Sequence, residues 1–200
     1  RFWLKAGDGL GDEDAAALFV NPLTAIAMFE EMKKSEAKAF IMTAAASQLC
    51  KLIAGLARDE GHDAIAIVRR EEHVGVLKEL GAAHVLNSAD PGFGGQLQAV
   101  LKETKPRVLL DAVADQISSD MFFAMGSRAR WIIYGKLSAQ LPVLSQAGQF
   151  IFMDKKIEGF WLSKWLKHAK REDVFAAGAK VQQRFASGAL GHIQRASAAS

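Results

Sequence analysis

The sequence predicts an α/β protein built on a Rossmann-like, doubly wound sheet of six parallel strands with helices on both faces. The first observation is that half of the 200 residues are apolar, which is enough for the core of one such domain. The second is that short apolar runs alternate along the chain with segments of helical periodicity. Six of these runs have the length of buried strands: residues 39–42, 64–68, 83–87, 108–113, 130–135 and 157–162.

Residues 39–70 predict a βαβ unit. The first strand is followed by a turn of small residues, 43–47. The next apolar residues have the spacing of one helix face: Leu49, Leu52, Ile53, Leu56 and Ala57. Gly61 is expected to end this helix before the second strand begins. In dinucleotide-binding proteins, such a turn lets the pyrophosphate approach the backbone and the helix N-terminus.

The turn lacks the usual glycine fingerprint, since Ala44, Ser47 and Cys50 stand where glycines normally recur. Alanine and serine still permit a close approach, although neither tolerates a positive φ as glycine does. From periodicity alone, a nucleotide is somewhat favoured over no ligand. The alternative, in which small residues only let the helix pack tightly on the sheet, stays open.

The other helices follow from periodicity and from helix-terminating residues. Asn21 and Pro22 are expected to start a helix, because proline suits the first turn. Further helices are expected at residues 71–80, 96–103, 121–125 and 164–187. Gly92, Gly94 and Gly95 follow no strand in the register of a phosphate loop, so we interpret them as a flexible surface connection.

Ligands of doubly wound sheets bind beyond the carboxyl ends of the strands, near the switch in strand order. In this sequence the rule selects residues 43–49, Arg69, residues 113–114, residues 134–137 and residues 160–162. Arg69 and Arg70 follow the second strand, where a domain that binds NAD normally carries an acid for the ribose 2′-hydroxyl. A guanidinium there instead favours the 2′-phosphate of NADPH.

Composition excludes several other classes. The net charge of +3 is small and its basic residues are scattered, so no nucleic-acid partner is expected. No apolar run reaches membrane-spanning length, and the first residues do not resemble a signal peptide, so we expect no membrane partner. One cysteine rules out an internal disulfide framework and favours a reducing compartment, so we expect a cytoplasmic location. One cysteine and five histidines far apart in the sequence predict no metal site.

Several segments together resemble the medium-chain dehydrogenase/reductase superfamily, and most of all its zinc-independent quinone reductases and trans-2-enoyl-thioester reductases. They are N-P-L-T-A from Asn21, V-R-R from Val68, L-G-A-A-H-V-L-N-S from Leu80, Y-G-K-L-S from Tyr134 and I-E-G-F-W-L-S-K-W from Ile157. The resemblance runs from about Asn21 to Ile193, and G-F-W-L-S-K-W is its most specific part.

The resemblance implies a division of the chain and a set of partners. Residues 21–193 would be the NADP-binding Rossmann domain, and residues 194–200 a frayed tail. Residues 1–20 would be a linker from an N-terminal GroES-like domain that carries most substrate contacts and the proton donor. The partners would be a small-molecule substrate, that GroES-like domain and a second copy of the chain, giving a homodimer.

The resemblance also implies cofactor-binding residues, while it leaves the catalytic residues unknown. Asn21 would face the nicotinamide, and Arg69 with Arg70 would lie at the adenosine phosphate. The pyrophosphate would meet Ala46, Ser47, Gln48 and Leu49. The nicotinamide groove would be lined by Tyr134, Gly135, Lys136, Leu137, Phe160, Trp161 and Leu162.

Each assignment has a structural alternative. Asn21 would instead cap its helix, and the two arginines would be solvated charges at a strand end. Tyr134 would be a buried strand aromatic, because it has no lysine four residues on to make an acid–base pair. Phe160 and Trp161 would be core or subunit-contact aromatics.

The function expected from these observations is hydride transfer from NADPH to an activated C=C bond or a quinone, with this chain supplying the cofactor-binding domain. One alternative is the cofactor domain of a zinc-dependent alcohol dehydrogenase. The other is a non-catalytic nucleotide-binding module, which the altered glycine turn favours.

Overall fold

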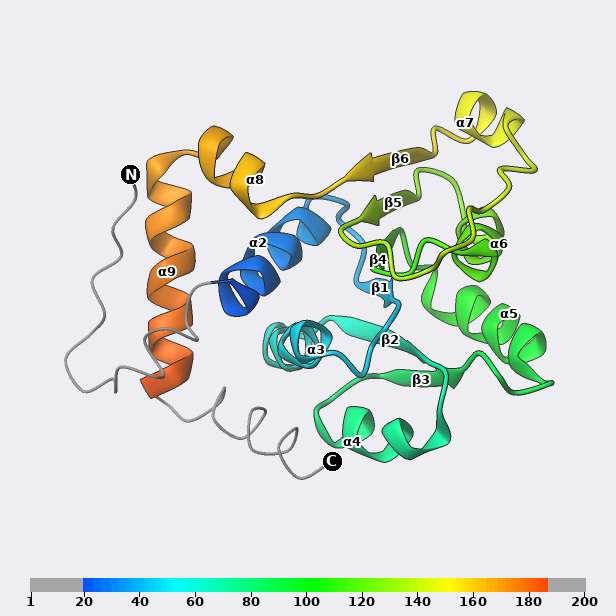
Figure 1. Ribbon diagram of the computed structural model, residues 1–200, viewed down its shortest axis with the longest axis horizontal. Coiled ribbons are helices and arrows are strands. Elements are labelled where there is room, and N and C mark those ends of the chain that lie inside the picture. The colour runs from blue at the N-terminus through cyan, green and yellow to red at the C-terminus, as the bar shows by residue number, and fades with distance from the viewer. Residues whose placement is uncertain (1–19, 187–200) are drawn as a thin grey trace.

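The computed structural model describes residues 20–186, which form one parallel sheet with helices on both faces (Figure 1). Its strands are β1 (Ala39–Met42), β2 (Asp63–Val68), β3 (His84–Asn87), β4 (Val108–Asp111), β5 (Arg130–Ile133) and β6 (Lys156–Gly159). Their order is β3-β2-β1-β4-β5-β6, so the chain reverses direction across the sheet between β1 and β4. The predicted six-stranded, doubly wound parallel sheet is confirmed.

The helices alternate with these strands. They are α2 (Asn21–Lys33), α3 (Gln48–Glu60), the 3₁₀ turn η1 (Glu71–His73), α4 (Val74–Glu79), α5 (Phe93–Thr104), α6 (Gln116–Ala124), α7 (Gly148–Phe152), α8 (Leu162–His168) and α9 (Arg171–Ala186). None of the helices in the described part of the chain is long and apolar enough to cross a membrane.

The core has two layers because side chains of the buried strands alternate between the two faces of the sheet. In β1, Phe40 and Met42 pack with α2, α3 and α9, whereas Ala39 and Ile41 pack with α5 and α6. Figure 1 shows the first group of helices to the left of the sheet and the second to its right. Lys180 of α9 adds hydrogen bonds to Glu30 and Glu60, which attach α9 to α2 and α3.

The helix after β1 begins and ends as its sequence predicts. The Ser47 side chain caps α3 by accepting a hydrogen bond from the Cys50 amide at 3.3 Å. Gly61 ends the helix in the left-handed conformation, with φ of 72°. These two residues fix where β1 stops and β2 can start.

The predicted boundaries are wrong at the end of the chain. β6 ends at Gly159, so residues 160–162 lie outside the strand and Leu162 begins α8. The single predicted helix at 164–187 is two helices, because Ala169 is extended with ψ of 147°. Leu162 and the apolar residues of α8 that follow it pack against the core. β6 pairs with β5 alone, and it is shorter than the apolar run that contains it.

Two further predictions are corrected. Gly94 and Gly95 belong to the first turns of α5, and do not form a surface connection. The short helix α7 had no counterpart in the sequence analysis. The linker predicted at residues 1–20, Val20 apart, and the tail predicted at 194–200 lie outside the described residues.

Candidate functional site

A recess of about 550 Å³ lies at the carboxyl ends of β1, β2 and β4, where the strand order reverses. Its lining comes from the turn at residues 43–47, residues 67–70 at the end of β2, the segment that leads into α6 with the first turns of that helix, and residues 137–140 after β5. The fold rule for doubly wound sheets places ligands at this edge. This recess is therefore the candidate site.

The turn between β1 and α3 presents backbone N–H groups to the recess. Ala44 adopts φ of 48° without being glycine, and hydrogen bonds from the amides of Thr43 and Ala45 to neighbouring strands hold the turn in place. Within residues 20–186, the amides of Ala46, Gln48 and Leu49 have no hydrogen-bond partner. Such unpaired donors at a helix N-terminus attract an anion.

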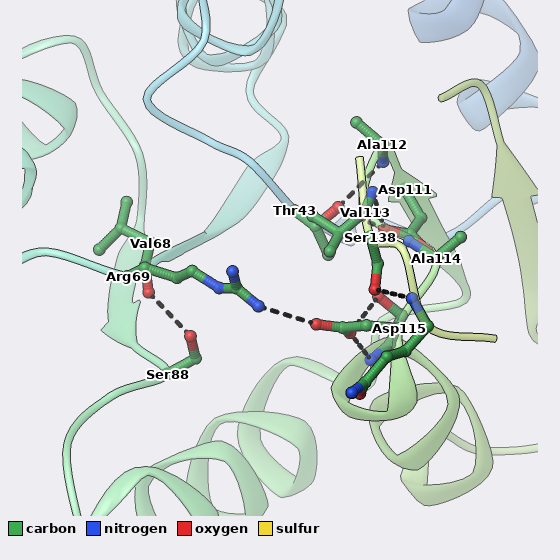
Figure 2. Close-up of polar contacts among 12 residues, drawn as sticks. Thr43, Val68, Arg69, Ser88, Asp111, Ala112, Val113, Ala114, Asp115 and Ser138 are labelled. Carbon is green, nitrogen blue, oxygen red and sulfur yellow. Dashed lines mark hydrogen bonds and ion pairs between the residues drawn. The ribbon is translucent and has the colours of Figure 1, made fainter. Parts of the chain in front are cut away.

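Arg69 reaches from the end of β2 towards Asp115, as Figure 2 shows. Its Nη2 lies 3.2 Å from Asp115 Oδ2, while the other Asp115 oxygen caps α6 by accepting the Ser118 amide at 3.0 Å. Because the Arg69 side chain is 70% exposed and makes this one ion pair, the pair is weak and leaves donors for a ligand. Arg70 pairs with Glu72 at 3.3 Å.

A buried carboxylate fixes the floor of the recess (Figure 2). Asp111, at the end of β4, accepts four hydrogen bonds. The donors are Thr43 Oγ1, Trp131 Nε1 and the amides of Val113 and Ala114. Thr43 also accepts a hydrogen bond from the Ala112 amide, at 3.0 Å. Asp111 therefore joins β1, β4, β5 and the loop before α6 into one rigid edge.

The structure brings five of the predicted residues together at the recess. They are Ala46, Ser47, Arg69, Arg70 and Leu137. Gln48 and Leu49 lie in the first turn of α3, with their side chains outside the lining. The buried Gln48 Oε1 has no hydrogen-bond partner among the described residues, which leaves one acceptor for a ligand donor.

The segment after β5 follows the edge of the recess by backbone pairing. Amides of Tyr134, Leu137 and Ser138 donate to carbonyls of residues 111–113. Gly135 permits this approach, because a Cβ there would lie 3.1 Å from the Ala112 carbonyl oxygen. Lys136 is exposed and does not line the recess.

Tyr134 points into the core and away from the recess. Its hydroxyl lies 3.2 Å from Cys50 Sγ, and the Cys50 sulfur also contacts the Thr43 carbonyl. Burial raises the pKa of Tyr134 far above its usual value and raises the pKa of the Cys50 thiol as well. The predicted alternative, a buried aromatic with a satisfied hydroxyl, describes this geometry.

The remaining predicted residues lie elsewhere. Asn21 is exposed at the first position of α2, and the capping position is Val20, so the alternative role of Asn21 as a cap is wrong. Phe160 and Trp161 line a separate recess of about 190 Å³ beside Glu31 and Arg130. Leu162 packs on the core at the start of α8.

Sequence reasoning missed several lining residues, among them His73, Ser88, Asp115 and residues 138–140. Ser88 follows β3, so the rule that selected the ends of the other strands would also have selected it. Asp115 had a weaker signal as an acid in the usual position of a helix cap. Over residues 20–186, no three His, Cys, Asp or Glu side chains come together in an arrangement that holds a metal ion.

Comparison with known proteins identifies the relatives of this chain. The family described as zinc-binding dehydrogenase matches residues 49–180. The mitochondrial enoyl-[acyl-carrier-protein] reductases of Bos taurus and Homo sapiens are each 29% identical over 78% of this chain and 43% of their own length.

Solved structures extend the comparison. A candidate NADPH:quinone reductase of Mesorhizobium loti is 51% identical, with a TM-score of 0.88 over 92% of this chain and 54% of that one. The mitochondrial 2-enoyl thioester reductase heterodimer of Candida tropicalis is 23% identical, and its TM-score of 0.78 over 92% of this chain and 53% of that one shows the shared fold.

The chain spans about half the length of these relatives. The family match covers more than half of the chain, and it includes β2 to β6 and the lining of the recess from residue 67 onwards. This chain belongs to the zinc-binding dehydrogenase family, within the medium-chain dehydrogenase/reductase superfamily.

Proposed function

We propose that residues 21–193 are the NADP(H)-binding domain of a reductase that transfers hydride from NADPH to an activated C=C bond or a quinone. The observation that carries the proposal is the pairing, in one recess, of unpaired amides at the start of α3 with an arginine directly after β2. The relative with 51% identity is described as a candidate NADPH:quinone reductase, and curated relatives are named enoyl reductases.

The two ends of the recess suit the two anionic groups of the adenosine half of NADPH. The amides of Ala46, Gln48 and Leu49 would hold the pyrophosphate, supported by the α3 dipole. Arg69 would hold the 2′-phosphate by charge-assisted hydrogen bonds. The turn before α3 stands on the edge fixed by Asp111, and the backbone before Arg69 is held in the sheet because β2 pairs with both β1 and β3.

NADPH, when bound, supplies the hydride, and the residues of this chain bind and orient it. Leu137 and the segment after β5 would border the path of the nicotinamide half. The buried Tyr134 hydroxyl has no part in proton transfer. We therefore assign the proton donor and the substrate contacts to a GroES-like domain joined through residues 1–20, and treat 194–200 as a tail.

The cofactor preference tests the proposal. In calorimetry we expect the chain to bind NADPH more tightly than NADH, and Arg69→Ala to weaken NADPH by roughly tenfold to a hundredfold with little effect on NADH. Arg70→Ala is the matched control, because it removes the same charge at the adjacent position, where the side chain lies beside Glu72 and not beside Asp115. Equal affinities of the unmodified chain for the two cofactors, or a larger loss from Arg70→Ala, would contradict the assignment.

Two finer proposals concern assembly and location. We propose that the enzyme is a homodimer, supported by the open edge of β6, and the Candida tropicalis relative is described as a heterodimer. We propose the cytoplasm as its compartment, as the sequence analysis expects, although the named enoyl reductase relatives are mitochondrial. Fractionation of cells that express the tagged enzyme distinguishes the two compartments.

A further inference from the structure

A second recess, of about 720 Å³, lies at the opposite end of the sheet from the cofactor site. It is lined by the C-terminal half of α5, residues 105–107 leading into β4, the last residue of α6 and residues 126–128 before β5. We propose that this recess binds a small anion carrying a diphosphate group, at a site separate from the proposed NADP(H) site.

All of the charged side chains that line the recess are positive. Four cationic side chains line it, those of Lys102, Lys105, Arg107 and Arg128, and no acidic residue of the described chain is part of the lining. None of the four makes an ion pair or a side-chain hydrogen bond within residues 20–186. Their positive charges and N–H donors are therefore available to a ligand.

Helix C-termini offer a structural reason for such cations, because α5 and α6 both end at the recess and basic residues stabilise helix ends. The contacts argue against this reason. The last carbonyls of α6 are already bound by the buried Lys155, whose Nζ lies 2.8 Å from Phe122 O and 2.7 Å from Met125 O. None of the four lining side chains bonds to a helix carbonyl, so these side chains do not cap α5 or α6.

Two of the four cations stand where the backbone would prefer glycine. Lys105 ends α5 at φ of 48°, and Arg128 has φ of 62°. A residue with a side chain is strained in this left-handed region, and helix ends commonly place glycine there. The long basic side chains at these two positions are thus not explained by the turns they occupy.

The frame of the recess is rigid. The Arg107 carbonyl accepts the Arg130 amide at 2.8 Å, and the Arg128 amide donates to the Met153 carbonyl at 2.7 Å. Both segments are thereby fixed beside each other at the start of β4 and β5. Several cations on one backbone frame suit a group with several adjacent phosphate oxygens, because guanidinium and ammonium groups donate charge-assisted hydrogen bonds to such oxygens.

The lining also determines what accompanies the diphosphate. The apolar Ala99, Leu101, Pro106 and Ala124 form part of the wall, which leaves room for a small organic group next to the charges. The diphosphate can come from two sources, free inorganic pyrophosphate or a nucleoside diphosphate. Both present the same charged group to the four cations.

The test uses the full 200-residue chain and two probes, inorganic pyrophosphate and ADP. Each is titrated by calorimetry into chain saturated with NADPH, and separately into saturated chain in which Lys105 and Arg128 are replaced. Binding that depends on Lys105 and Arg128 supports the second site even if the NADP(H) assignment is wrong, because neither residue lines the cofactor recess. The two proposals can therefore fail independently.

The decisive variant is Lys105→Gly/Arg128→Gly, because glycine removes two charges at positions where it fits the backbone better. We expect it to fold with unchanged or higher stability and to weaken pyrophosphate by at least tenfold. Lys78→Ala/Lys164→Ala, which removes two exposed charges elsewhere, is the matched control and should retain full affinity. Tighter ADP than pyrophosphate would identify a nucleoside diphosphate as the ligand, and the reverse order would identify free pyrophosphate.

The proposal is overturned if neither probe binds to the NADPH-saturated chain. It is also overturned if the double glycine variant keeps its affinity within twofold, or if the control variant loses as much as the glycine variant. An NMR titration shows where the probe binds. The amide resonances of Lys105, Arg107 and Gly126 should shift, while those of Ser47 and Arg69 should not.

Discussion

Asp111 is a buried carboxylate on which the geometry of the candidate site depends. Burying a carboxylate is unfavourable unless hydrogen bonds compensate, and Asp111 has four donors from three different segments. The side chain is fully buried and is not part of the lining of the recess. Its role is therefore to position the turn after β1 and the loop before α6.

Replacing Asp111 by alanine should be strongly destabilising. The change leaves Trp131 Nε1, Thr43 Oγ1 and two amides without their acceptor, so we expect a loss of about 3–5 kcal/mol in the free energy of unfolding. Urea denaturation measures it. Asp120→Ala, an exposed acid on α6, serves as the control and should change stability by less than about 0.5 kcal/mol. Similar losses in both variants would contradict the role given to Asp111.

Lys155 is a buried cation, only 2% exposed, and its amine donates to three carbonyls at the end of α6. Burial lowers the pKa of Lys155 from 10.5 to about 8. In the unfolded chain the amine keeps its ordinary pKa. Between about pH 8 and 10.5 the unfolded state therefore binds more protons than the folded state, and stability contributed by this residue rises with pH.

The pH dependence of Lys155 is measurable against a variant that cannot titrate. Lys155→Met removes the charge and the three hydrogen bonds. The unfolding free energy of the unmodified chain minus that of Lys155→Met should be larger at pH 10 than at pH 7.5, as measured in urea. Lys156→Met, at an exposed neighbouring position, should show no such increase. If this difference in unfolding free energy instead becomes smaller as the pH rises, the three carbonyls stabilise the protonated amine of Lys155 in the folded state.

At the scale of helices and strands, sequence reasoning succeeded where local signals and tertiary packing agree. The first strand was predicted at residues 39–42, and Gly61 was predicted to end α3, as observed. Both depend on strong local signals, an apolar run bounded by small residues and a left-handed glycine.

The failures at this scale have tertiary causes. The apolar run at 157–162 predicts one strand, but the edge strand ends at Gly159. Leu162 instead begins α8, which packs on the core. Tertiary contacts also explain why the sequence does not predict part of the lining of the recess. Asp115 and residues 138–140 reach the recess only because Asp111 and the pairing after β5 bring their segments there, and no local pattern shows that.

The glycines of α5 give a prediction about helix stability. Gly95 lies inside the helix, and a Cβ there would meet no atom within 4 Å. Gly95→Ala should therefore stabilise the chain by about 0.5–1 kcal/mol. Gly61→Ala should have the opposite effect and cost about 1 kcal/mol, although space is also open there, because its φ of 72° strains alanine. Thermal unfolding should show a higher melting temperature for Gly95→Ala and a lower one for Gly61→Ala. Shifts in the same direction for both variants would contradict these two predictions.

The whole molecule separates its two recesses by the length of the sheet. Parallel strands place all their carboxyl ends at one edge, with α3 directing its N-terminus there, and all their amino ends at the other, where α5 and α6 terminate. An anion at the first edge would meet backbone donors and Arg69, whereas an anion at the second would meet side-chain cations. The two proposed anion sites would thus differ in chemistry and share no lining residue.

The sheet also has two open edges, β3 and β6, and the surroundings favour β6 as the dimer contact. Exposed apolar side chains flank β6 on both sides in the sequence, Ile151 and Phe152 of α7 before it and Trp161 after it. An edge strand with apolar neighbours tends to pair with another chain. The contact is expected to extend one sheet into the other.

Removing one outward N–H of β6 tests this contact. The amides of Lys156 and Phe160 bond to β5, so alternation along the strand directs the Gly159 amide to the open edge. Gly159→Pro deletes that donor and should convert a dimer at tens of micromolar into a monomer, as sedimentation equilibrium would show. His84→Pro removes the outward donor of β3 in the same way, since the Ala83 amide bonds inward to Ala64, and should leave the dimer intact. A monomeric unmodified chain, or a dimer lost only in His84→Pro, would exclude β6 as the interface.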